Sequence, residues 1–310
     1  MEINFQVDPI DPGMLSHIFI KMSFADKTDY NINELIIPDT IDGNKILRLS
    51  LTLRYDIYEL AAKGFFIKKL IVSEGIKELP IKCFYGVENI NTVILPSTCI
   101  DIPPSCFELS SIKEVIASDN VCVIGASAFE QSNIERFSWP ASCDTVPTRC
   151  FFACSNFEQI DGMEQIEDIG DSAFELTKLK YFSWPARCKI VSKRCFYECR
   201  NLEQIDGLER VTEIKVGAFQ KTAIKKFLWP ASVSATEPRV FLANCVNLEE
   251  IKFEGTGIKD VDLAYFFSLK SIKKIDLSGC AAVNLLGTDI PEYAEFKKKL
   301  LLPYYVTKLN

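Results

Sequence analysis

Apolar residues recur along this chain with one short period. Phenylalanine stands at intervals of 22 or 23 residues, at Phe84, Phe107, Phe129, Phe151, Phe174, Phe196, Phe219 and Phe241. Within this period, three apolar residues are spaced by three and then two positions, as in Ile134-x-x-Phe137-x-Trp139, and a proline turn follows. This spacing is typical of a short strand whose flanking residues turn inward. A recurring unit that cannot bury its apolar face alone indicates stacked repeats, each giving one strand to a long parallel sheet.

The second half of each repeat combines small residues with the recurring phenylalanine, as in Ile169-Gly170-Asp171-Ser172-Ala173-Phe174. Such a segment predicts a tight turn or a short helical segment that returns the chain, with the phenylalanine packed behind the sheet. The predicted fold class is therefore an α/β repeat solenoid. Its curved parallel β-sheet has about eleven strands, with short turns or helical segments on the convex side.

Tryptophan adds a second period of 45 residues, in the triplets that begin at Trp139, Trp184 and Trp229. The last inward position of successive strands alternates, as Ala117, Trp139, Gly162, Trp184, Gly207 and Trp229. Two indoles at a strand spacing of ~4.8 Å would leave no room for each other, so we interpret the glycines as space for the rings. The tryptophans are then core residues. The alternative is an aromatic ligand-binding ladder on the surface.

The repeat pattern also predicts the domain organisation. We expect an N-terminal cap over residues 1–31, repeats over residues 32–278 and a C-terminal cap over residues 279–310. A longer insertion interrupts the period at residues 47–65. In the C-terminal cap, Pro291 predicts the start of a short helix that runs to about Leu300.

The chain has twelve cysteines, and their positions follow the repeat. Cys106, Cys150 and Cys195 each directly precede a repeat phenylalanine, and they are two repeats apart. This is roughly 10 Å between Cα atoms, beyond the ~7 Å limit for a disulfide. We interpret the cysteines as free buried thiols, which favours a reducing compartment, although a bond between cysteine rows within one repeat stays open.

Composition narrows the classes of function. The chain has 35 Lys and Arg against 42 Asp and Glu, a net charge of -7, so we expect no nucleic-acid partner. No signal segment or membrane span is evident, which favours a cytoplasmic location without membrane insertion. With His17 as the only histidine and no nucleophile evident beside it, we expect neither an enzyme, nor a metal site, nor a cofactor.

The repeat resembles a known family in three features that recur together. They are an apolar strand ending in proline, an Ile-Gly-x-x-Ala-Phe segment at residues 124–129 and 169–174, and a following cysteine. In this combination the chain is similar to the BspA-like leucine-rich repeats over about residues 33–278. The resemblance implies a leucine-rich-repeat-like fold with a binding surface used in adhesion or host contact. It implies no catalytic residues, and it leaves a cell-surface location open.

Function is therefore expected at strand positions that point out of the sheet. Around the middle apolar residue of each strand, these are the residue before it and the residue after it. They combine a row of isoleucines at one end with a polar tract in the middle. The predicted partner-binding residues of the concave face are Ile71, Ile94, Ile116, Arg136, Ser138, Gln159, Asp161, Tyr181, Ser183, Gln204 and Asp206.

Several hypotheses follow from this face. The first is a non-enzymatic scaffold that binds a protein partner, and the second is a structural component of an intracellular assembly such as the cytoskeleton. A third is saccharide binding around Tyr181, Gln204 and Asp206. For the isoleucine row, which Ile36 begins, two interpretations are open: a docking surface, or a patch that the N-terminal cap, around Ile18 to Met22, covers.

Overall fold

The computed structural model describes residues 2–21, 31–233, 238–255, 260–280, 282–286, 297–302 and 305–309. The chain forms two compact units, Met1–Gln165 and Ile166–Asn310, called unit 1 and unit 2 below. Each unit is a stack of repeats, and each is described by itself.

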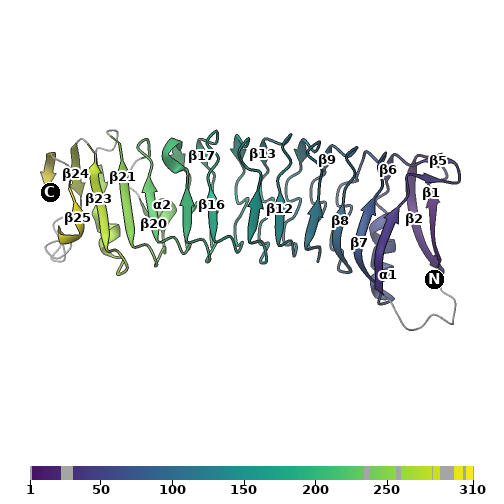
Figure 1. Cartoon of the computed structure of the whole chain (residues 1–310). Helices are drawn as coiled ribbons and strands as arrows, with labels where there is room; N and C mark the ends of the chain where they lie inside the picture. The colour runs from purple at the N-terminus through teal and green to yellow at the C-terminus, as the bar shows by residue number, and fades with distance from the viewer. Residues whose placement is uncertain are drawn as a thin grey trace. The chain divides into compact units, whose positions relative to one another are not determined.

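Unit 1 consists of short strands and one helix (Figure 1). Its elements are β1 (Glu2–Val7), β2 (Met14–Lys21), β3 (Asn31–Ile37), β4 (Thr40–Ile41), β5 (Asn44–Lys45), β6 (Arg48–Leu49), α1 (Leu53–Ala62), β7 (Phe66–Val72), β8 (Ile90–Ile94), β9 (Asp101–Ile102), β10 (Glu114–Ile116), β11 (Val123–Ile124), β12 (Arg136–Ser138), β13 (Thr145–Val146) and β14 (Gln159–Asp161). One strand from each repeat joins a six-stranded sheet in the order β14-β12-β10-β8-β7-β3.

Unit 2 repeats this arrangement. Its elements are β15 (Asp168–Ile169), β16 (Tyr181–Ser183), β17 (Ile190–Val191), β18 (Gln204–Asp206), η1 (Leu208–Arg210), β19 (Glu213–Ile214), β20 (Lys226–Trp229), α2 (Arg239–Leu242), β21 (Glu250–Glu254), β22 (Asp260–Asp262), α3 (Leu263–Phe267), β23 (Lys274–Gly279), β24 (Ala282–Leu286), η2 (Lys297–Lys299), β25 (Leu300–Leu301) and β26 (Tyr305–Leu309). Its main strands pair in parallel as β16-β18 and as β20-β21-β23-β25.

The parallel solenoid predicted from the sequence is confirmed in both units. All eleven predicted strands are present among the described residues, and β25 is a further one. The short helix predicted from Pro291 to about Leu300 lies only partly within the described residues. Residues 291–296 lie outside the described residues, and the segment that follows is the short 3-10 helix η2 and then β25. Leu300, predicted as the end of the helix, belongs to β25 and pairs in parallel with Ile275 of β23.

The two ends carry elements that the repeat period does not specify. At the N-terminus, β1 and β2 form an antiparallel pair, and Leu15 of β2 pairs with Leu49 of β6. The insertion at residues 47–65 contains α1, which buries Leu53 and Leu60. The extents of the two caps, 1–31 and 279–310, stay predictions.

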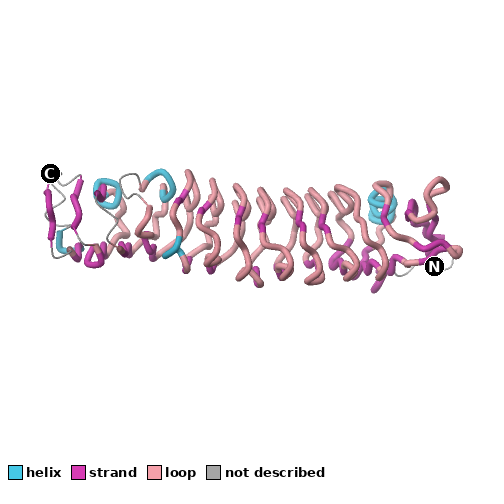
Figure 2. Tube along the Cα trace, turned by 90° about the horizontal axis from the view of Figure 1, so that it is seen from above, coloured by secondary structure: helices cyan, strands magenta, loops and turns pink. Residues whose placement is uncertain are grey.

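Turns make up most of each repeat (Figure 2), and they are joined by a hydrogen-bond ladder of their own. In unit 1 the amide of Phe84 donates to the carbonyl of Cys106 at 2.8 Å, and that of Phe107 to Ala128 at 2.7 Å. In the turns from Phe84 to Phe219, the residues two before and two after the phenylalanine adopt positive φ, such as Ser127 (57°) and Gln131 (55°) around Phe129. These turns are non-helical, because two left-handed residues, one on each side of the phenylalanine, reverse the chain. The segment that holds Phe241 is instead the short helix α2.

The recurring phenylalanines fill the core, as predicted. Phe129 is fully buried and stacks on Phe107 and Phe151, with ring centroids 5.3 and 5.1 Å apart. Rings of successive repeats stack in this way from Phe84 to Phe151 in unit 1 and from Phe174 to Phe219 in unit 2, at about the spacing between strands. No repeat could bury its own ring alone, so the stack is what stabilises each repeat.

The tryptophans are core residues, and the alternative of a surface ladder is wrong. Trp139, Trp184 and Trp229 are at most 3% exposed. Each indole N–H donates to the carbonyl four residues later, for example from Trp139 to Cys143 at 3.1 Å. This bond closes the proline turn that follows each strand.

The glycines that alternate with the tryptophans were predicted to leave space for the indole rings, and this physical reason is wrong. Trp229 stacks on Phe253 of the neighbouring strand at 5.1 Å, so a ring beside a ring is tolerated. Gly162 has φ +76°, and a Cβ there would lie 2.6 Å from the backbone carbonyl oxygen of Trp139. Gly207 repeats this geometry against Trp184, also at 2.6 Å. The glycines therefore make room for a backbone carbonyl rather than for an indole.

All twelve cysteines are free, and eleven are buried. Cys83, which the sequence analysis left out, also precedes a repeat phenylalanine. Burial raises the pKa of the Cys154 thiol to about 12 and of the Cys188 thiol to about 11. Buried thiols of this kind resist oxidation in any compartment, so they no longer argue for a reducing one.

This burial predicts the reactivity of the thiols. With a disulfide reagent such as DTNB at neutral pH, only Cys122 is expected to react in the native protein, because its side chain is exposed. Unfolding in guanidinium should release all twelve. A Cys122→Ser variant with a remaining fast-reacting thiol would contradict the described burial.

Candidate interaction surface

The outward strand positions form one open face on the sheet of unit 1. Glu114, Val115 and Ile116 of β10 pair with Thr92, Val93 and Ile94 of β8. Val115 and Val93 point into the core, and the residues beside them point out. The alternation follows from the two-residue period of a strand. The predicted assignment of inward and outward positions is therefore correct for these strands.

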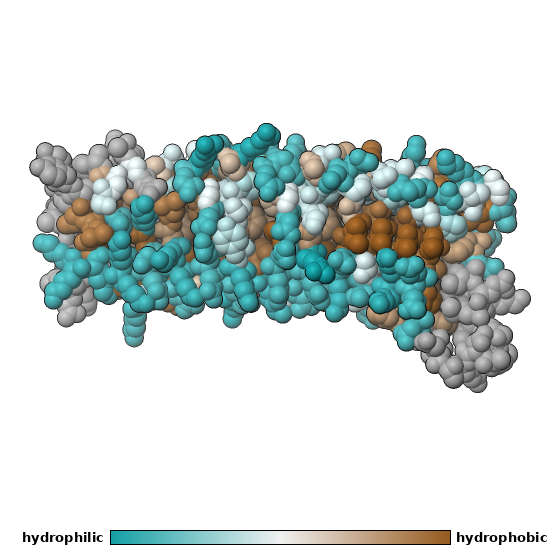
Figure 3. Space-filling view, in the orientation of Figure 1, coloured by the Kyte–Doolittle hydropathy of each residue, from teal (hydrophilic) through white to brown (hydrophobic). Residues whose placement is uncertain are grey.

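Four isoleucines lie side by side on this face and are called the isoleucine row below. Pairing places Ile36 beside Ile71, Ile71 beside Ile94, and Ile94 beside Ile116. Ile36 is 52% and Ile116 46% exposed, and the two between them are half-buried. Figure 3 shows an apolar band on this face, over the strands from β3 to β10, with hydrophilic atoms around it.

The exposure of the row bears on the two interpretations left open by the sequence. The cap segment in question runs from Ile18 to Met22. Its residues 18–21 belong to β2 and pair with β1, and Met22 lies outside the described residues. Ile36 and Ile116 stay exposed, so the described part of the hairpin does not cover them, and the docking interpretation stays a prediction.

One flank of the row is a shallow hollow of about 560 Å³. It is lined by Asn33, Glu34, Lys68, Lys69, Asn91, Thr92, Glu114 and Ile116. Two ion pairs join neighbouring strands on this flank. Lys69 pairs with Glu34 at 3.1 Å, and the Arg136 guanidinium pairs with Glu114 at 3.2 Å.

The other flank is acidic and was missed by the sequence analysis. Asp39, Glu74 and Asp119 each stand three positions after an outward isoleucine, at the turn that ends the strand, and all three are exposed. We call them the acidic flank. Hydrogen bonds from the Ser97 amide and hydroxyl, both 2.8 Å long, lower the pKa of Glu74 and keep it charged. The signal was present as a third row in the repeat frame.

The polar tract in unit 1 lies on β12 and β14. Arg136 pairs with Gln159, and Ser138 with Asp161, so all four predicted residues are neighbours and exposed. The Gln159 amide donates to the Asp161 carboxylate at 2.7 Å. The structure therefore brings these four residues together, beside Glu114 of the isoleucine-bearing strand β10.

The remaining predicted residues lie together in unit 2. Tyr181 and Ser183 of β16 pair with Gln204 and Asp206 of β18, and Tyr181 is 51% exposed. Gln204 donates to Asp206 at 2.8 Å, as its counterpart does in unit 1. A hollow of about 530 Å³ lies on this face and includes Gln204, Asp206, Lys226 and Glu250 among its lining residues.

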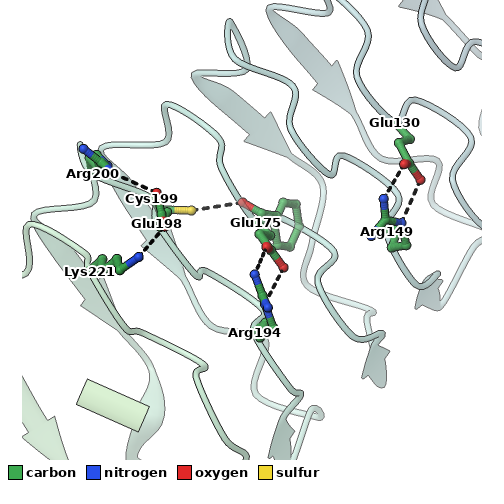
Figure 4. A network of polar contacts seen from close by, with 9 residues as sticks. Glu130, Arg149, Glu175, Arg194, Glu198, Cys199, Arg200 and Lys221 are labelled. Atoms are coloured by element: carbon green, nitrogen blue, oxygen red, sulfur yellow. Dashed lines mark hydrogen bonds and ion pairs between the residues drawn. The ribbon is translucent and has the colours of Figure 1, made fainter. Parts of the chain in front are cut away.

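Paired charges at the turns hold neighbouring repeats together (Figure 4). In unit 1, Arg149 binds the buried carboxylate of Glu130 with two nitrogens, one at 2.9 Å, and its guanidinium lies 3.6 Å from the centre of the Phe152 ring. In unit 2, Arg194 binds Glu175 in the same way, at 3.0 Å for one bond. Such bidentate pairs fix geometry as well as charge. They stabilise the turns and take no part in the open face.

These pairs also set the protonation of the carboxylates. Burial raises the pKa of Glu130, but hydrogen bonds from Arg149 and Ser127 outweigh it and lower that pKa overall. In unit 2, hydrogen bonds from Lys221 and Arg200 lower the pKa of Glu198 to about 2 (Figure 4). These carboxylates are therefore charged at neutral pH and act as structural anions.

Two further findings concern what the described part of the chain holds. No group of three or more His, Cys, Asp or Glu side chains within it is placed to hold a metal ion. Among its helices, none is long and apolar enough to cross a membrane.

Comparison with known proteins identifies the repeat. The model of the BspA type leucine rich repeat region matches residues 77–203 and 167–289, in six copies. The chain belongs to this family. The matched region contains Ile94 and Ile116 of the isoleucine row, whereas Ile36 and Ile71 precede it. A search of the curated protein sequences gives no match.

One solved leucine-rich repeat structure shares the fold of this chain. A leucine-rich repeat protein from Bacteroides ovatus is 14% identical with a TM-score of 0.61, and 99% of each chain is covered. A leucine rich cell surface protein from Faecalibacterium prausnitzii is 15% identical with a TM-score of 0.48, over 99% of this chain and 96% of that one. At such identities, the first likeness shows a shared fold, and the second carries no further argument.

Proposed function

We propose that this BspA-type repeat protein is a non-enzymatic scaffold that binds a protein partner through the open face of its sheet, in the manner of adhesion repeats. The observation that carries the proposal is the isoleucine row. Four in-register isoleucines at outward positions, two of them about half exposed, form a contiguous apolar surface of the kind that interaction sites use.

The energetics support a contact at this row. Fully burying an isoleucine side chain contributes about 1.5–3 kcal/mol, so the exposed halves of Ile36 and Ile116 would contribute roughly 1 kcal/mol each. The surrounding polar residues would form the rim, as in other protein interfaces. The polar tract from Arg136 to Asp161 continues the face beyond the row.

Partner capture tests this function. We expect the double variant Ile94→Asp and Ile116→Asp to lose the proteins that the wild type captures from native lysate, as measured by mass spectrometry. The fold should persist, because both side chains point away from the core. Val123→Asp is the matched control, since Val123 is 53% exposed on β11 of the same unit. Equal capture by the double variant and the wild type would overturn the site.

Other sequence-based hypotheses stay predictions. Saccharide binding near Tyr181, Gln204 and Asp206 can be checked on a glycan array. Fractionation of native cells distinguishes a cytoplasmic or cytoskeletal location from the cell surface.

A further inference from the structure

We infer that the isoleucine row receives an amphipathic α-helix of the partner, whose apolar stripe lies along the row and whose basic side chains face the acidic flank. The inference rests on the proposed function and adds the chemistry of the partner. It draws on the spacing of the row and on the charges beside it.

The spacing of the row suits a helix. Four isoleucines on adjacent strands at ~4.8 Å span about 14 Å across the strands. Apolar residues at positions i, i+4, i+7 and i+11 of a helix lie on one face and rise about 16 Å, at 5.4 Å per turn. The helix stripe is only about 2 Å longer than the row of four isoleucines, so each apolar helix residue can contact the isoleucine beneath it.

An extended peptide laid along the same row fits less well. Its side chains on one face recur about every 6.7 Å, so two intervals cover about 13 Å against about 10 Å for the isoleucines. The third contact would already fall between two strands. The extended peptide could not form a hydrogen-bonded ladder with the sheet either, because it would cross the strands instead of running beside them.

The two flanks of the row differ in charge, and this difference predicts the charge of the partner. Among the described residues, Asp39, Glu74 and Asp119 carry no ion pair, and hydrogen bonds keep Glu74 charged. Lys45 lies near Asp39, since side-chain atoms of both approach the Cβ position of Gly75 within 4 Å. On the other flank, the carboxylates Glu34 and Glu114 are paired with Lys69 and Arg136, and Lys68 also lines the hollow. A helix with lysines or arginines on one side of its stripe complements this arrangement.

The distance between the stripe and the acidic flank suits long cationic side chains. Each acid stands three residues beyond its isoleucine, which is at most about 10 Å along an extended chain. Lysine and arginine reach this far because their stems can lie on apolar surface while the charged group stays in water. The charges should therefore contribute mainly to the rate and selectivity of binding, and the isoleucines to affinity.

Synthetic peptides test the inference with the full-length protein. The probe is a fluorescent alanine-based helix with leucine at i, i+4, i+7 and i+11 and lysines on one side of that stripe. Fluorescence anisotropy should show saturable binding, at least about tenfold weaker to Ile94→Asp. The triple variant Asp39→Asn, Glu74→Gln and Asp119→Asn should also bind at least about tenfold more weakly and lose most of the salt dependence. Val123→Asp should bind like the wild type.

Three comparison peptides make the result decisive. They are a version with glutamate in place of lysine, a scrambled sequence of the same composition, and a peptide with alternating apolar and polar residues. Equal or tighter binding of any of them overturns the helix inference, and so does an absence of binding by the probe. If native partners are still captured in a row-dependent manner, the proposed function survives that outcome. If neither peptides nor native partners depend on the row, both proposals fail.

Discussion

Replacing Phe129 with alanine is expected to destabilise unit 1 by about 3–5 kcal/mol. Phe129 is fully buried, it stacks on Phe107 and Phe151, and its ring centroid lies 4.9 Å from that of Phe137. The truncation removes contacts in three repeats at once, and the stack cannot collapse into the cavity while the turn ladder holds the repeats apart. The strand of each neighbouring repeat should lose protection along with the mutated one.

Urea unfolding followed by circular dichroism measures the loss, and hydrogen exchange with mass spectrometry locates it. Exchange should rise first in residues 84–151, which hold the stacked rings. Phe66→Ala is the control, because Phe66 is 42% exposed on β7, and its change should stay below about 1 kcal/mol. A similar loss in both variants would argue against a core built on the phenylalanine stack.

Replacing Gly162 with alanine is expected to destabilise unit 1 by about 2–5 kcal/mol, through two effects that add. The left-handed φ of +76° costs a side chain about 1–2 kcal/mol. The new Cβ would also lie 2.6 Å from the Trp139 carbonyl oxygen, and such overpacking costs about 1–3 kcal/mol. To relieve it, β14 must move away from β12, which strains the bond from the Trp139 amide to the Asp161 carbonyl, now 2.9 Å long.

A matched glycine separates the two effects. Gly43 has φ +80° in the same unit, but a Cβ there meets nothing within 4 Å. Gly43→Ala should therefore cost only the conformational part, about 1–2 kcal/mol. Both variants are compared with the wild type in urea. If Gly162→Ala costs no more than Gly43→Ala, the close approach to Trp139 does not constrain the repeat.

The role of the glycines shows where the sequence stopped being informative. Alternation of Trp139 with Gly162 was visible as a 45-residue period, and it correctly predicted a buried tryptophan. The reason for the glycine was not visible, because it depends on the left-handed backbone at Gly162 and on its close approach to the Trp139 carbonyl oxygen in the fold. Backbone direction at a turn leaves no trace in the pattern of apolar residues.

The candidate surface likewise has features that the sequence predicted and features that it did not. The position of Ile94 and Ile116 on the open face followed from the two-residue alternation of a strand, and their adjacency from the repeat period. The acidic flank was missed because Glu74 and Asp119 lie beyond the strands, where the two-residue alternation ends and only the repeat frame marks their position. Compensation of Glu114 by Arg136 was equally invisible, since it depends on side-chain conformations across two repeats.

The sequence by itself determined the repeat, its strands, its buried rings and the face that points outward, because in a stack each residue meets its counterpart one period away. The tertiary structure alone decided how the turns close, which charges pair and which stay open. Those features depend on left-handed backbone at residues such as Ser127 and on distances between repeats, and neither is encoded in the order of apolar and polar residues.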